Sequence, residues 1–242
     1  MWGERSFVLF CLFCAVSLTC ANAVPLVTKC AANDIKCMKR SAQAVIPMFT
    51  EGLPQYGVQS LDPFTLKSVD ASTSNLKLVV KDMVVTGLKG CVATKIQRDL
   101  ATSKLQTNFL CNVRAEGQYE MHGRLLVLPI EGKGKAQVQL NKIQMNVLND
   151  MGERTGKDGK KHWHIKGSTY TYELKDKAHV NFENLFNGNE VLGRAAREII
   201  ANNGNDVVLE VGPPVIKAIV DKIVENVNHF YRAIPADELA LD

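Results

Sequence analysis

The cysteines are the residues whose spacing in this 242-residue sequence most clearly indicates chemistry. Three of the seven lie in an apolar N-terminal run, and the other four are Cys30, Cys37, Cys91 and Cys111. Six residues separate Cys30 from Cys37, which does not match the common zinc-binding spacings. A bridge between them would close a loop of eight residues and contribute about 2.5 kcal/mol to stability. We therefore predict a Cys30–Cys37 disulfide.

Cys91 and Cys111 lie on either side of a predicted turn at 99–104. Because residue 101, midway between them, falls inside this turn, a symmetric hairpin would place the two cysteines opposite each other, where a disulfide is possible. The alternation of apolar residues instead favours a register shifted by one residue, which would put the cysteines on opposite faces. A β-bulge would reconcile the two patterns. The sequence therefore leaves two alternatives open, a second disulfide or two buried free thiols.

Recognisable catalytic motifs are absent from the sequence. It contains no Gly-x-Ser-x-Gly, no phosphate-binding loop, no dinucleotide fingerprint and no His-Glu-x-x-His. His162 and His164 are its only close histidine pair, and on a strand both would point to the same face, as two metal ligands would. No carboxylate or cysteine lies at a telling spacing, so we interpret this segment as a solvated strand end with Trp163 turned inward. We predict no catalytic residue, no metal site and no cofactor, and a protein that is not an enzyme.

The composition argues against two broad classes of protein. Hydrophobic residues make up 46% and charged residues 22% of the chain, as in globular proteins and unlike disordered chains. The net charge is +4, from 29 Lys and Arg against 25 Asp and Glu, which is too small for the basic stripe of a nucleic-acid-binding protein. A local cluster of Lys157, Lys160 and Lys161 is interpreted as an exposed hairpin tip. We therefore expect no nucleic-acid partner.

The N-terminal residues have the pattern of a secretory signal peptide. An apolar run of 14 residues at 7–20 follows Arg5 and precedes Ala21-Asn22-Ala23, a small-x-small cleavage pattern. The run is shorter than the ~20 residues that a membrane-spanning helix needs. We predict a signal peptide at 1–23, one mature domain at 24–242 and secretion, the alternative being an uncleaved anchor. Because no other long apolar run follows, we predict no transmembrane segment.

The middle of the chain, from 64 to 182, has the alternation of β-strands. Apolar and polar residues alternate at 105–113, 137–141 and 169–172, as expected for an antiparallel sheet with one apolar and one solvated face. Turn residues such as Gly, Asn and Asp separate these runs. We predict six to eight long antiparallel strands.

Helices are predicted before and after this region. Apolar residues at three- and four-residue spacing predict a helix over 35–53, which Pro47 would kink or end. A second helix at 190–203 is expected to end at Gly204, and a longer one to run from 213 to 235, with prolines at both ends.

The last helix determines the predicted architecture. At about 20 residues it would form a rod of about 30 Å, with a broad apolar face that needs an equally long apolar surface to lie against. The long strands supply one if the sheet curls around the helix. The predicted fold is α+β, a long C-terminal α-helix wrapped by a highly curved antiparallel β-sheet. Such a wrap leaves an elongated apolar space wherever the side chains do not fill it.

Four stretches, spread in order over nearly the whole mature chain, share their motifs with one family. They are Cys30 and Cys37 with GLPQYGV at 52–58 and LDPF at 61–64; VVTGL at 84–88; YEMHGRLLVLPIEGKG at 119–134; and NLFNGN at 184–189 with Leu192-Gly193, Asn202-Asn203 and the helix ending at Pro235. The third is similar, almost position for position, to the signature Tyr-x3-Gly-x-Leu-Leu-x-Leu-Pro-Ile-x-Gly-x-Gly. The ordered set resembles the insect takeout / juvenile-hormone-binding-protein family.

The resemblance implies a function as well as a fold. The expected fold is a helix inside a super-roll of sheet with an elongated internal hydrophobic tunnel. The implied function is a secreted carrier, in haemolymph or another extracellular fluid, of a small lipophilic ligand such as a juvenile-hormone-like terpenoid, a fatty-acyl compound or another long hydrophobic molecule. The haemolymph hormone carriers have a second disulfide near the C-terminal helix, whereas no cysteine follows Cys111 here. The chain is therefore more similar to the takeout branch. We expect a monomer, and leave open a receptor or a membrane surface as a further partner.

The predicted ligand contacts are large apolar residues of the inward faces, for each of which core packing is the competing interpretation. They are Phe49, Phe109, Tyr119, Trp163, Tyr170, Tyr172, Phe182, Phe186, Ile219, Ile223, Val227 and Phe230. Burial of ligand surface at about 25 cal/mol/Å² would supply affinity, and a few polar groups would fix orientation. The alternative function is a secreted interaction or signalling protein with a filled core, acting through a protein or a lipid surface. An internal apolar cavity would favour the carrier.

Overall fold

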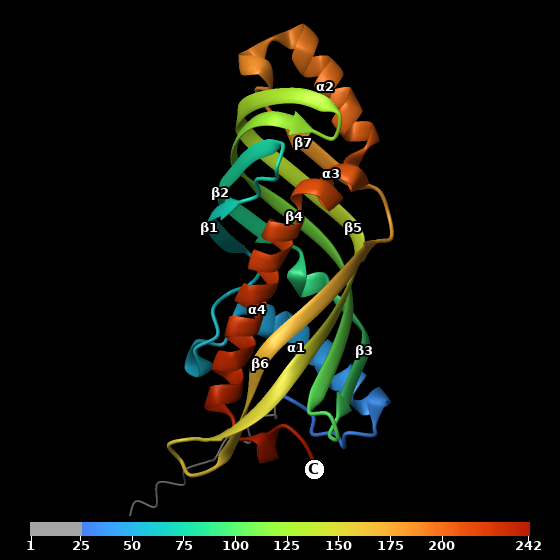
Figure 1. The fold of residues 1–242 in the computed structure, drawn as a ribbon. Coiled ribbons are helices and arrows are strands. Elements are labelled where there is room, and N and C mark those ends of the chain that lie inside the picture. The colour runs from blue at the N-terminus through green and yellow to red at the C-terminus, as the bar shows by residue number, and fades with distance from the viewer. Residues whose placement is uncertain (1–25) are drawn as a thin grey trace, which may run out of the picture.

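The computed structural model describes residues 26–242, so the predicted signal peptide and its cleavage site lie outside the described residues. Figure 1 shows an elongated molecule in which a curved sheet holds the last long helix against one side. The α-helices are α1 (Ile35–Glu51), α2 (Glu190–Asn202), α3 (Gly204–Val211) and α4 (Pro213–Ala233). The strands are β1 (Phe64–Asp70), β2 (Leu76–Thr86), β3 (Val92–Asp99), β4 (Lys104–Leu125), β5 (Leu128–Thr155), β6 (Lys161–Leu174) and β7 (Ala178–Phe182). This confirms the predicted α+β fold.

The sheet is built on two long strands, β4 and β5, of 22 and 28 residues. All pairs are antiparallel, in the order β1-β2-β4-β5-β6, while β3 also pairs with β4 and β7 with β5. We call the lower half the part where 104–111 of β4 and 143–155 of β5 pair with β3 and β6. The upper half is the remainder, where β4 and β5 pair with β2 and β7 (Figure 1).

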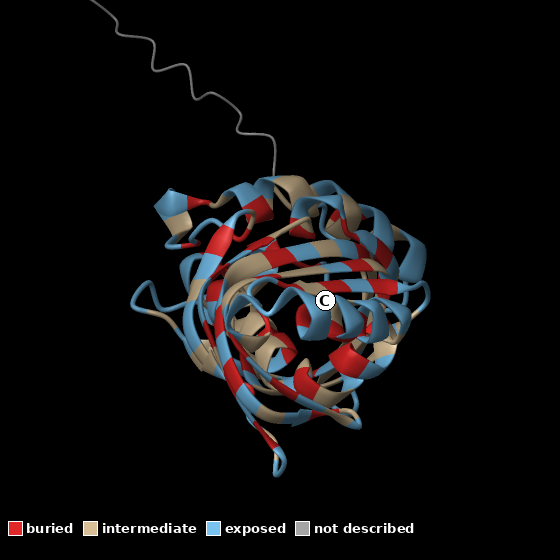
Figure 2. Cartoon of the chain, turned by 90° about the horizontal axis from the view of Figure 1, so that it is seen from above, coloured by how far each residue is buried: buried red, intermediate tan, exposed pale blue. Residues whose placement is uncertain are grey.

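The two halves meet at an irregularity in the central strands. The register between β4 and β5 shifts between Cys111 and Val113, where Lys142 has φ of 53°. The side chain of Asn112 accepts a hydrogen bond of 2.8 Å from the Lys142 backbone N–H. Such a bulge increases local bending, which helps the sheet to curl around the interior, as the view along the molecule shows (Figure 2).

Both disulfides are present, Cys30–Cys37 and Cys91–Cys111. The register between β3 and β4 explains how Cys91 and Cys111 can form a disulfide, which the sequence left open. Val92 lies opposite Leu110, as in the symmetric hairpin, and the register then shifts by one residue after Ala93. The bulge allows the cysteines to face each other while Ala93, Ile96 and Leu105 still join one apolar cluster.

The helices cover different parts of the sheet. α1 contacts β3, α2 and α3 contact β7, and α4 contacts β6 and β1. α1 does not end at Pro47, as the sequence allowed, but continues to Glu51 before Gly52. The chain after Asn203 does not run straight into the last helix, because α3 intervenes. A Cβ on Gly204 would lie 2.0 Å from the Ala178 carbonyl oxygen, so glycine here permits close packing of α3 on β7.

Candidate ligand site

Two of the predicted ligand residues belong to a filled core in the upper half. Tyr119 and Phe182 are only 2% and 4% exposed, and their ring centroids lie 4.8 Å apart. The Tyr119 hydroxyl donates a hydrogen bond of 2.6 Å to the Glu183 carbonyl oxygen, and burial raises the pKa of Tyr119 to about 12. Phe186 is half-buried against the same cluster. Tyr119 and Phe182 therefore contribute to the stability of the fold, and their role as ligand contacts stays a prediction.

The lower half places four other predicted residues in a different environment. Cross-strand pairing aligns Phe109, Met145 and Tyr172 in one row across β4, β5 and β6. The next row contains Thr107, Val147 and Tyr170. Paired residues point to the same face of a sheet, and Phe109, Met145 and Tyr172 pack against the core. All six side chains in the two rows are only half-buried.

The helix α4 presents the matching side. Ile219 and Ile223 pack against the same core but stay half-buried, as does Val227, whereas Val220 and Phe230 on the same helix are buried. Desolvation raises the pKa of Tyr170 on β6, partly opposed by Lys217 of α4. The lower half thus brings together large apolar side chains, three hydroxyl groups and one helix face, and leaves these side chains only half-buried.

An aromatic cluster occupies the end of the lower half. Phe49 of α1 and Phe230 of α4 contact each other edge to face, with centroids 5.8 Å apart. Trp163 makes a similar contact with Tyr231 at 5.7 Å, and the Arg98 guanidinium lies 4.7 Å from the centre of the Trp163 ring. The prediction that Trp163 turns inward is confirmed. Burial raises the pKa of Tyr231 to about 12. These residues join the strands, both long helices and the C-terminal segment at one end of the roll.

Three residues in the two half-buried rows were missed from the sequence, namely Thr107, Met145 and Val147. The sequence does contain a signal for two of them. Polar and apolar residues alternate at Gln144, Met145, Asn146 and Val147, as they do in the runs from which strands were predicted. The predicted ligand contacts on the strands were all aromatic, so these smaller residues were not among them. Each nevertheless shares a row with Phe109, Tyr170 or Tyr172.

Comparison with known proteins assigns the family. A family model described as haemolymph juvenile hormone binding protein matches residues 7–241. This chain belongs to that family. The circadian clock-controlled protein daywake of Drosophila melanogaster is 27% identical over 226 residues, covering 87% of this chain and 85% of the relative. The crystal structure of Takeout 1 of Epiphyas postvittana superposes with a TM-score of 0.86 and 32% identity, over 89% of this chain and 100% of that chain.

A further member of the juvenile hormone binding protein family matches over a shorter length. The juvenile hormone-binding protein of Manduca sexta is 24% identical over 152 residues, 61% of this chain and 55% of that protein. The family is one of binding proteins for small hydrophobic ligands rather than of enzymes, and members such as the juvenile hormone binding protein are haemolymph proteins. No helix among the described residues is long and apolar enough to cross a membrane.

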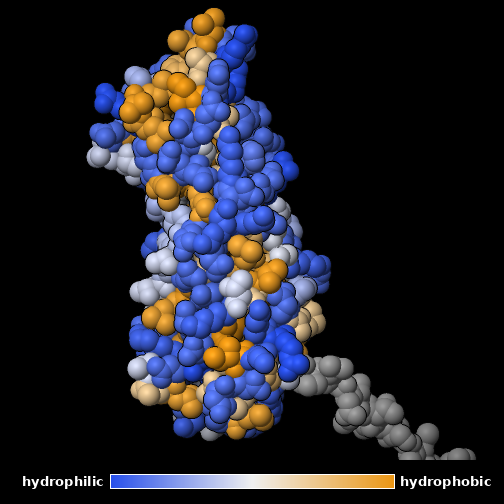
Figure 3. Space-filling model, turned by 90° about the vertical axis from the view of Figure 1, so that its right-hand side faces the viewer, coloured by the Kyte–Doolittle hydropathy of each residue, from blue (hydrophilic) through white to orange (hydrophobic). Residues whose placement is uncertain are grey.

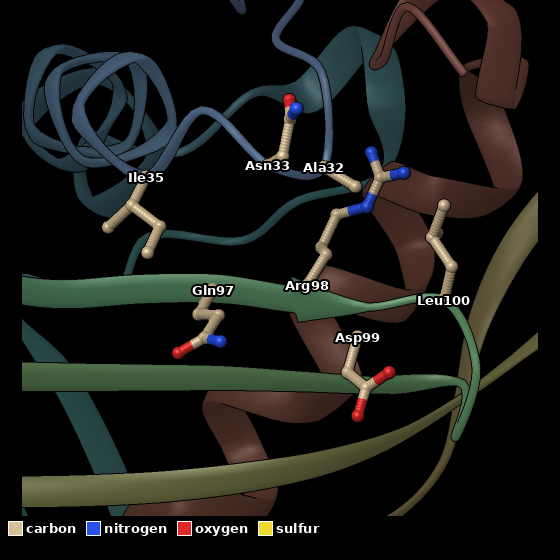
Figure 4. A pocket seen from close by; sticks show the side chains of 7 residues that line it. All are labelled: Ala32, Asn33, Ile35, Gln97, Arg98, Asp99 and Leu100. Atoms are coloured by element: carbon tan, nitrogen blue, oxygen red, sulfur yellow. The ribbon is translucent and has the colours of Figure 1, made fainter.

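Two surface pockets of the described residues lie away from the two half-buried rows. One, of about 290 Å³, lies between the Cys30–Cys37 loop and the end of β3 (Figure 4), lined by Ala32, Asn33, Ile35, Gln97, Arg98, Asp99 and Leu100. The other, of about 410 Å³, is lined by Asp82, Val84, Thr86, Arg114, Glu116, Gly117, Gln118 and Lys135. Both are open depressions, and none of the predicted ligand residues lines either of them.

The two histidines of the β5–β6 hairpin have separate environments. His162 is buried, with Nε2 3.0 Å from an Asp158 carboxylate oxygen and Nδ1 3.1 Å from the Tyr231 carbonyl oxygen. His164 makes no such contacts, and its Nδ1 atom is buried without a hydrogen-bond partner. In the described part of the chain no three His, Cys, Asp or Glu side chains gather as metal ligands would.

Exposed apolar side chains gather at the upper end of the molecule (Figure 3). Val127 in the β4–β5 turn is 87% exposed and Val191 at the start of α2 is 80% exposed. Leu192 of α2 and Leu209 of α3 are also exposed. The turn is held beside α3, because the Leu126 N–H donates a hydrogen bond of 2.9 Å to the Glu210 carboxylate. This apolar end is distinct from the two half-buried rows of the lower half.

Proposed function

We propose that this protein carries one long lipophilic molecule between α4 and the lower half of the sheet, and that it catalyses no reaction. The observation that carries the proposal is the half-burial of the rows containing Phe109, Tyr170 and Tyr172, and of Ile219 and Ile223 opposite them. Large apolar side chains between a helix and a sheet normally bury completely. Surface that packing leaves uncovered here is available to an apolar ligand.

The chemistry of the rows favours a particular kind of ligand. Most of the surface is apolar, so burying a hydrocarbon chain at about 25 cal/mol/Å² supplies the affinity. The hydroxyl groups of Thr107, Tyr170 and Tyr172 add a few polar groups that fix its orientation. A terpenoid or fatty-acyl molecule with one polar group fits this composition. Membership of a family of hydrophobic-ligand carriers supports the same class.

The proposal includes secretion as a monomer. The apolar run at 7–20 and the small-x-small pattern at 21–23 support cleavage after Ala23. The two disulfides support an oxidising compartment. N-terminal sequencing of the protein secreted by insect cells is expected to begin at Val24. Retention of residues 1–23 in the secreted protein would contradict this part of the proposal.

Native mass spectrometry of the secreted protein, followed by organic extraction, tests the main proposal. We expect one co-purifying lipophilic molecule for each chain, or stoichiometric uptake of a terpenoid or fatty-acyl probe by the empty protein. A protein that is empty and takes up neither class of probe would contradict the carrier.

Adjacent residues of β5 provide a matched pair of variants for the location of the ligand. Val147 lies in the inward row, and Leu148 points to the other face and is 38% exposed. Val147→Trp should reduce probe binding at least about tenfold by filling the space, because removing roughly 60 Å² of ligand burial costs about 1.5 kcal/mol. Leu148→Trp adds a larger side chain on the outside and should bind normally. Equal binding by the two folded variants would place the ligand elsewhere.

The exposed apolar end favours a second candidate, an interaction protein. Val127, Val191 and Leu192 could contact a partner even if the interior were filled. The same experiments separate the candidates, because an interaction protein would bind no lipophilic probe and would be insensitive to Val147→Trp. Substitution of Val127 and Val191 by Ser would instead remove its activity.

A further inference from the structure

The β5–β6 hairpin brings basic side chains together at a position that the carrier function does not use. Gly152 of β5 pairs with His164 of β6, and Arg154 pairs with His162. Gly152, Arg154, His162 and His164 therefore share one face of the hairpin. Lys166 of β6 follows two residues after His164. It lies at the shift in register between β5 and β6, because Met151 pairs with Ile165 and Asp150 pairs with Gly167.

Gly152 leaves the space into which two basic side chains fold. A Cβ at this position would lie 2.5 Å from His164 Cε1 and 2.9 Å from Lys166 Cε. Both side chains therefore cross directly over the glycine backbone, next to Arg154. We call Arg154, His164 and Lys166 the basic cluster. Any residue larger than glycine would displace two of its three members.

Two polar atoms of the basic cluster are buried without partners. Arg154 Nη2 and His164 Nδ1 have no hydrogen-bond partner among the described residues, and they are the two side-chain atoms found in that state there. An unpaired buried donor is costly, the more so on a charged group. The side chain of His162 cannot relieve this cost, because its two nitrogens already face Asp158 and the Tyr231 carbonyl oxygen.

The nearby carboxylates already contact other side chains. Glu153 pairs with Lys161 at 2.9 Å, and Asp158 contacts His162 at 3.0 Å. Asp150 forms an ion pair with Lys104. Residues 150–166 contain five Lys and Arg but three Asp and Glu, so the hairpin as a whole has excess positive charge. On this face of the hairpin the protein therefore supplies positive charge and two unpartnered polar atoms, while the three carboxylates of the hairpin contact other side chains.

We propose that the basic cluster is a binding site for a phosphoryl oxyanion, either free phosphate or the phosphate of a lipid headgroup. The planar guanidinium of Arg154 matches the oxygens of a tetrahedral anion. The tautomer of His164 that carries its hydrogen on Nδ1 adds a second donor, and Lys166 adds a positive charge. The bound oxyanion satisfies the two unpartnered atoms and offsets the positive charges of Arg154 and Lys166. This site is independent of the apolar rows in the lower half.

The first test measures binding of inorganic phosphate by isothermal titration calorimetry, with ionic strength held constant by sodium chloride. We expect saturable binding to one site per chain. Arg154→Gln should weaken it about tenfold to a hundredfold, as removal of a charge-assisted hydrogen bond does. Lys157→Gln is the matched control, since it removes one positive charge from the tip of the same hairpin outside the cluster. Equal weakening by the two variants would overturn the site in favour of a general charge effect.

Gly152→Val tests the geometry separately from the charge. It keeps every basic residue but displaces His164 and Lys166, so phosphate binding should be lost while the net charge is unchanged. Circular dichroism and the thermal midpoint verify that the variant is folded, and Gly152→Ala, with a smaller side chain, replaces it if it is not. Normal phosphate binding by a folded variant would overturn the proposal.

Vesicles distinguish the two sources of the oxyanion. Flotation is measured with phosphatidylcholine vesicles that contain or lack phosphatidic acid, whose phosphate is a monoester. If the protein binds phosphatidic acid, and Arg154→Gln abolishes this binding while Lys157→Gln preserves it, the oxyanion is the phosphate of a lipid headgroup. If the protein binds free phosphate but not the vesicles, and the two variants differ in the same way, the oxyanion is the soluble phosphate ion. Binding of neither, or binding insensitive to Arg154→Gln, overturns the site.

Discussion

In the upper half of the molecule, Tyr119 and Phe182 are almost completely buried and contact each other at 4.8 Å. In the lower half, Tyr170 and Tyr172 of β6 pair with Val147 and Met145 of the long strand β5 and remain half-buried. The difference follows from what covers each half. β7, α2 and α3 cover the upper half with short elements, whereas in the lower half α4 lies against β6 and α1 lies against β3. A straight rod inside a curved sheet cannot touch every row equally, so residues of similar chemistry serve stability in one half and remain available to a ligand in the other.

The largest expected effect is on the stability of the upper half. Phe182→Ala should lower the free energy of unfolding by about 3–5 kcal/mol, as removal of a buried aromatic side chain does. Tyr172→Ala in the lower half should cost clearly less, because Tyr172 is already partly accessible. Urea denaturation measures both values. Equal losses would show that the two halves are equally well packed and would remove the basis of the comparison.

The disulfide at the junction of the halves should have the next largest effect. Replacing Cys91 and Cys111 together by Ala removes a link across a sequence separation of 20 residues, which corresponds to about 3 kcal/mol. We expect the denaturation midpoint to fall while a single transition is kept. Two separate transitions would indicate that this link alone makes the halves unfold together. Replacement of Cys30 and Cys37, which closes a shorter loop, is the control.

Alkaline pH distinguishes the tyrosines of the two regions. Burial raises the pKa of Tyr119 and of Tyr231 to about 12, from 10.0. The unfolded chain ionises first, so the stability from each residue is complete below pH 10 and is lost as pH rises towards 12, up to about 2 kcal/mol each.

The tyrosines of the apolar rows provide the contrast in the same titration. The pKa of Tyr170 and of Tyr172 is raised mainly by desolvation, but by a smaller amount. The near-ultraviolet absorbance of tyrosinate should therefore show Tyr170 and Tyr172 ionising before Tyr119. A bound lipophilic probe should delay ionisation of Tyr170 and Tyr172 and leave Tyr119 unchanged. Tyr172→Phe assigns the signal, and a probe that shifts Tyr119 instead would place the ligand in the upper half.

The smallest expected effect comes from one hydroxyl group. Tyr119→Phe removes the hydrogen bond of 2.6 Å to the Glu183 carbonyl oxygen and should cost about 1 kcal/mol. Tyr170→Phe removes a hydroxyl from the apolar rows and should leave stability within about 0.5 kcal/mol. Thermal denaturation of the two variants, with probe binding measured in parallel, should therefore show stability loss in the first and altered probe affinity in the second.

Much of the architecture could be predicted because its signals are local. Period-two alternation indicated strands across 64–182, and the prolines at 213 and 235 bounded the last helix, which spans Pro213–Ala233. The disulfide of Cys30 and Cys37 followed from spacing. The helix α3, of eight residues, was missed because it lies between Gly204 and Pro213, which we interpreted as the end of one helix and the start of the next. The helix α1 continues through Pro47 because it packs against β3, and such tertiary packing cannot be predicted from local helix propensity.

The sequence by itself determined which side chains point inward, because alternation along a strand assigns each residue to a face. It did not determine which inward residues would be buried, so Tyr119 and Tyr172 were predicted to have the same role. That distinction depends on the distance from each row to the element opposite, and curvature, bulges and helix placement set this distance. The Cys91–Cys111 disulfide and the basic cluster over Gly152 also depend on the tertiary structure. In both places a one-residue shift in register determines which side chains contact each other.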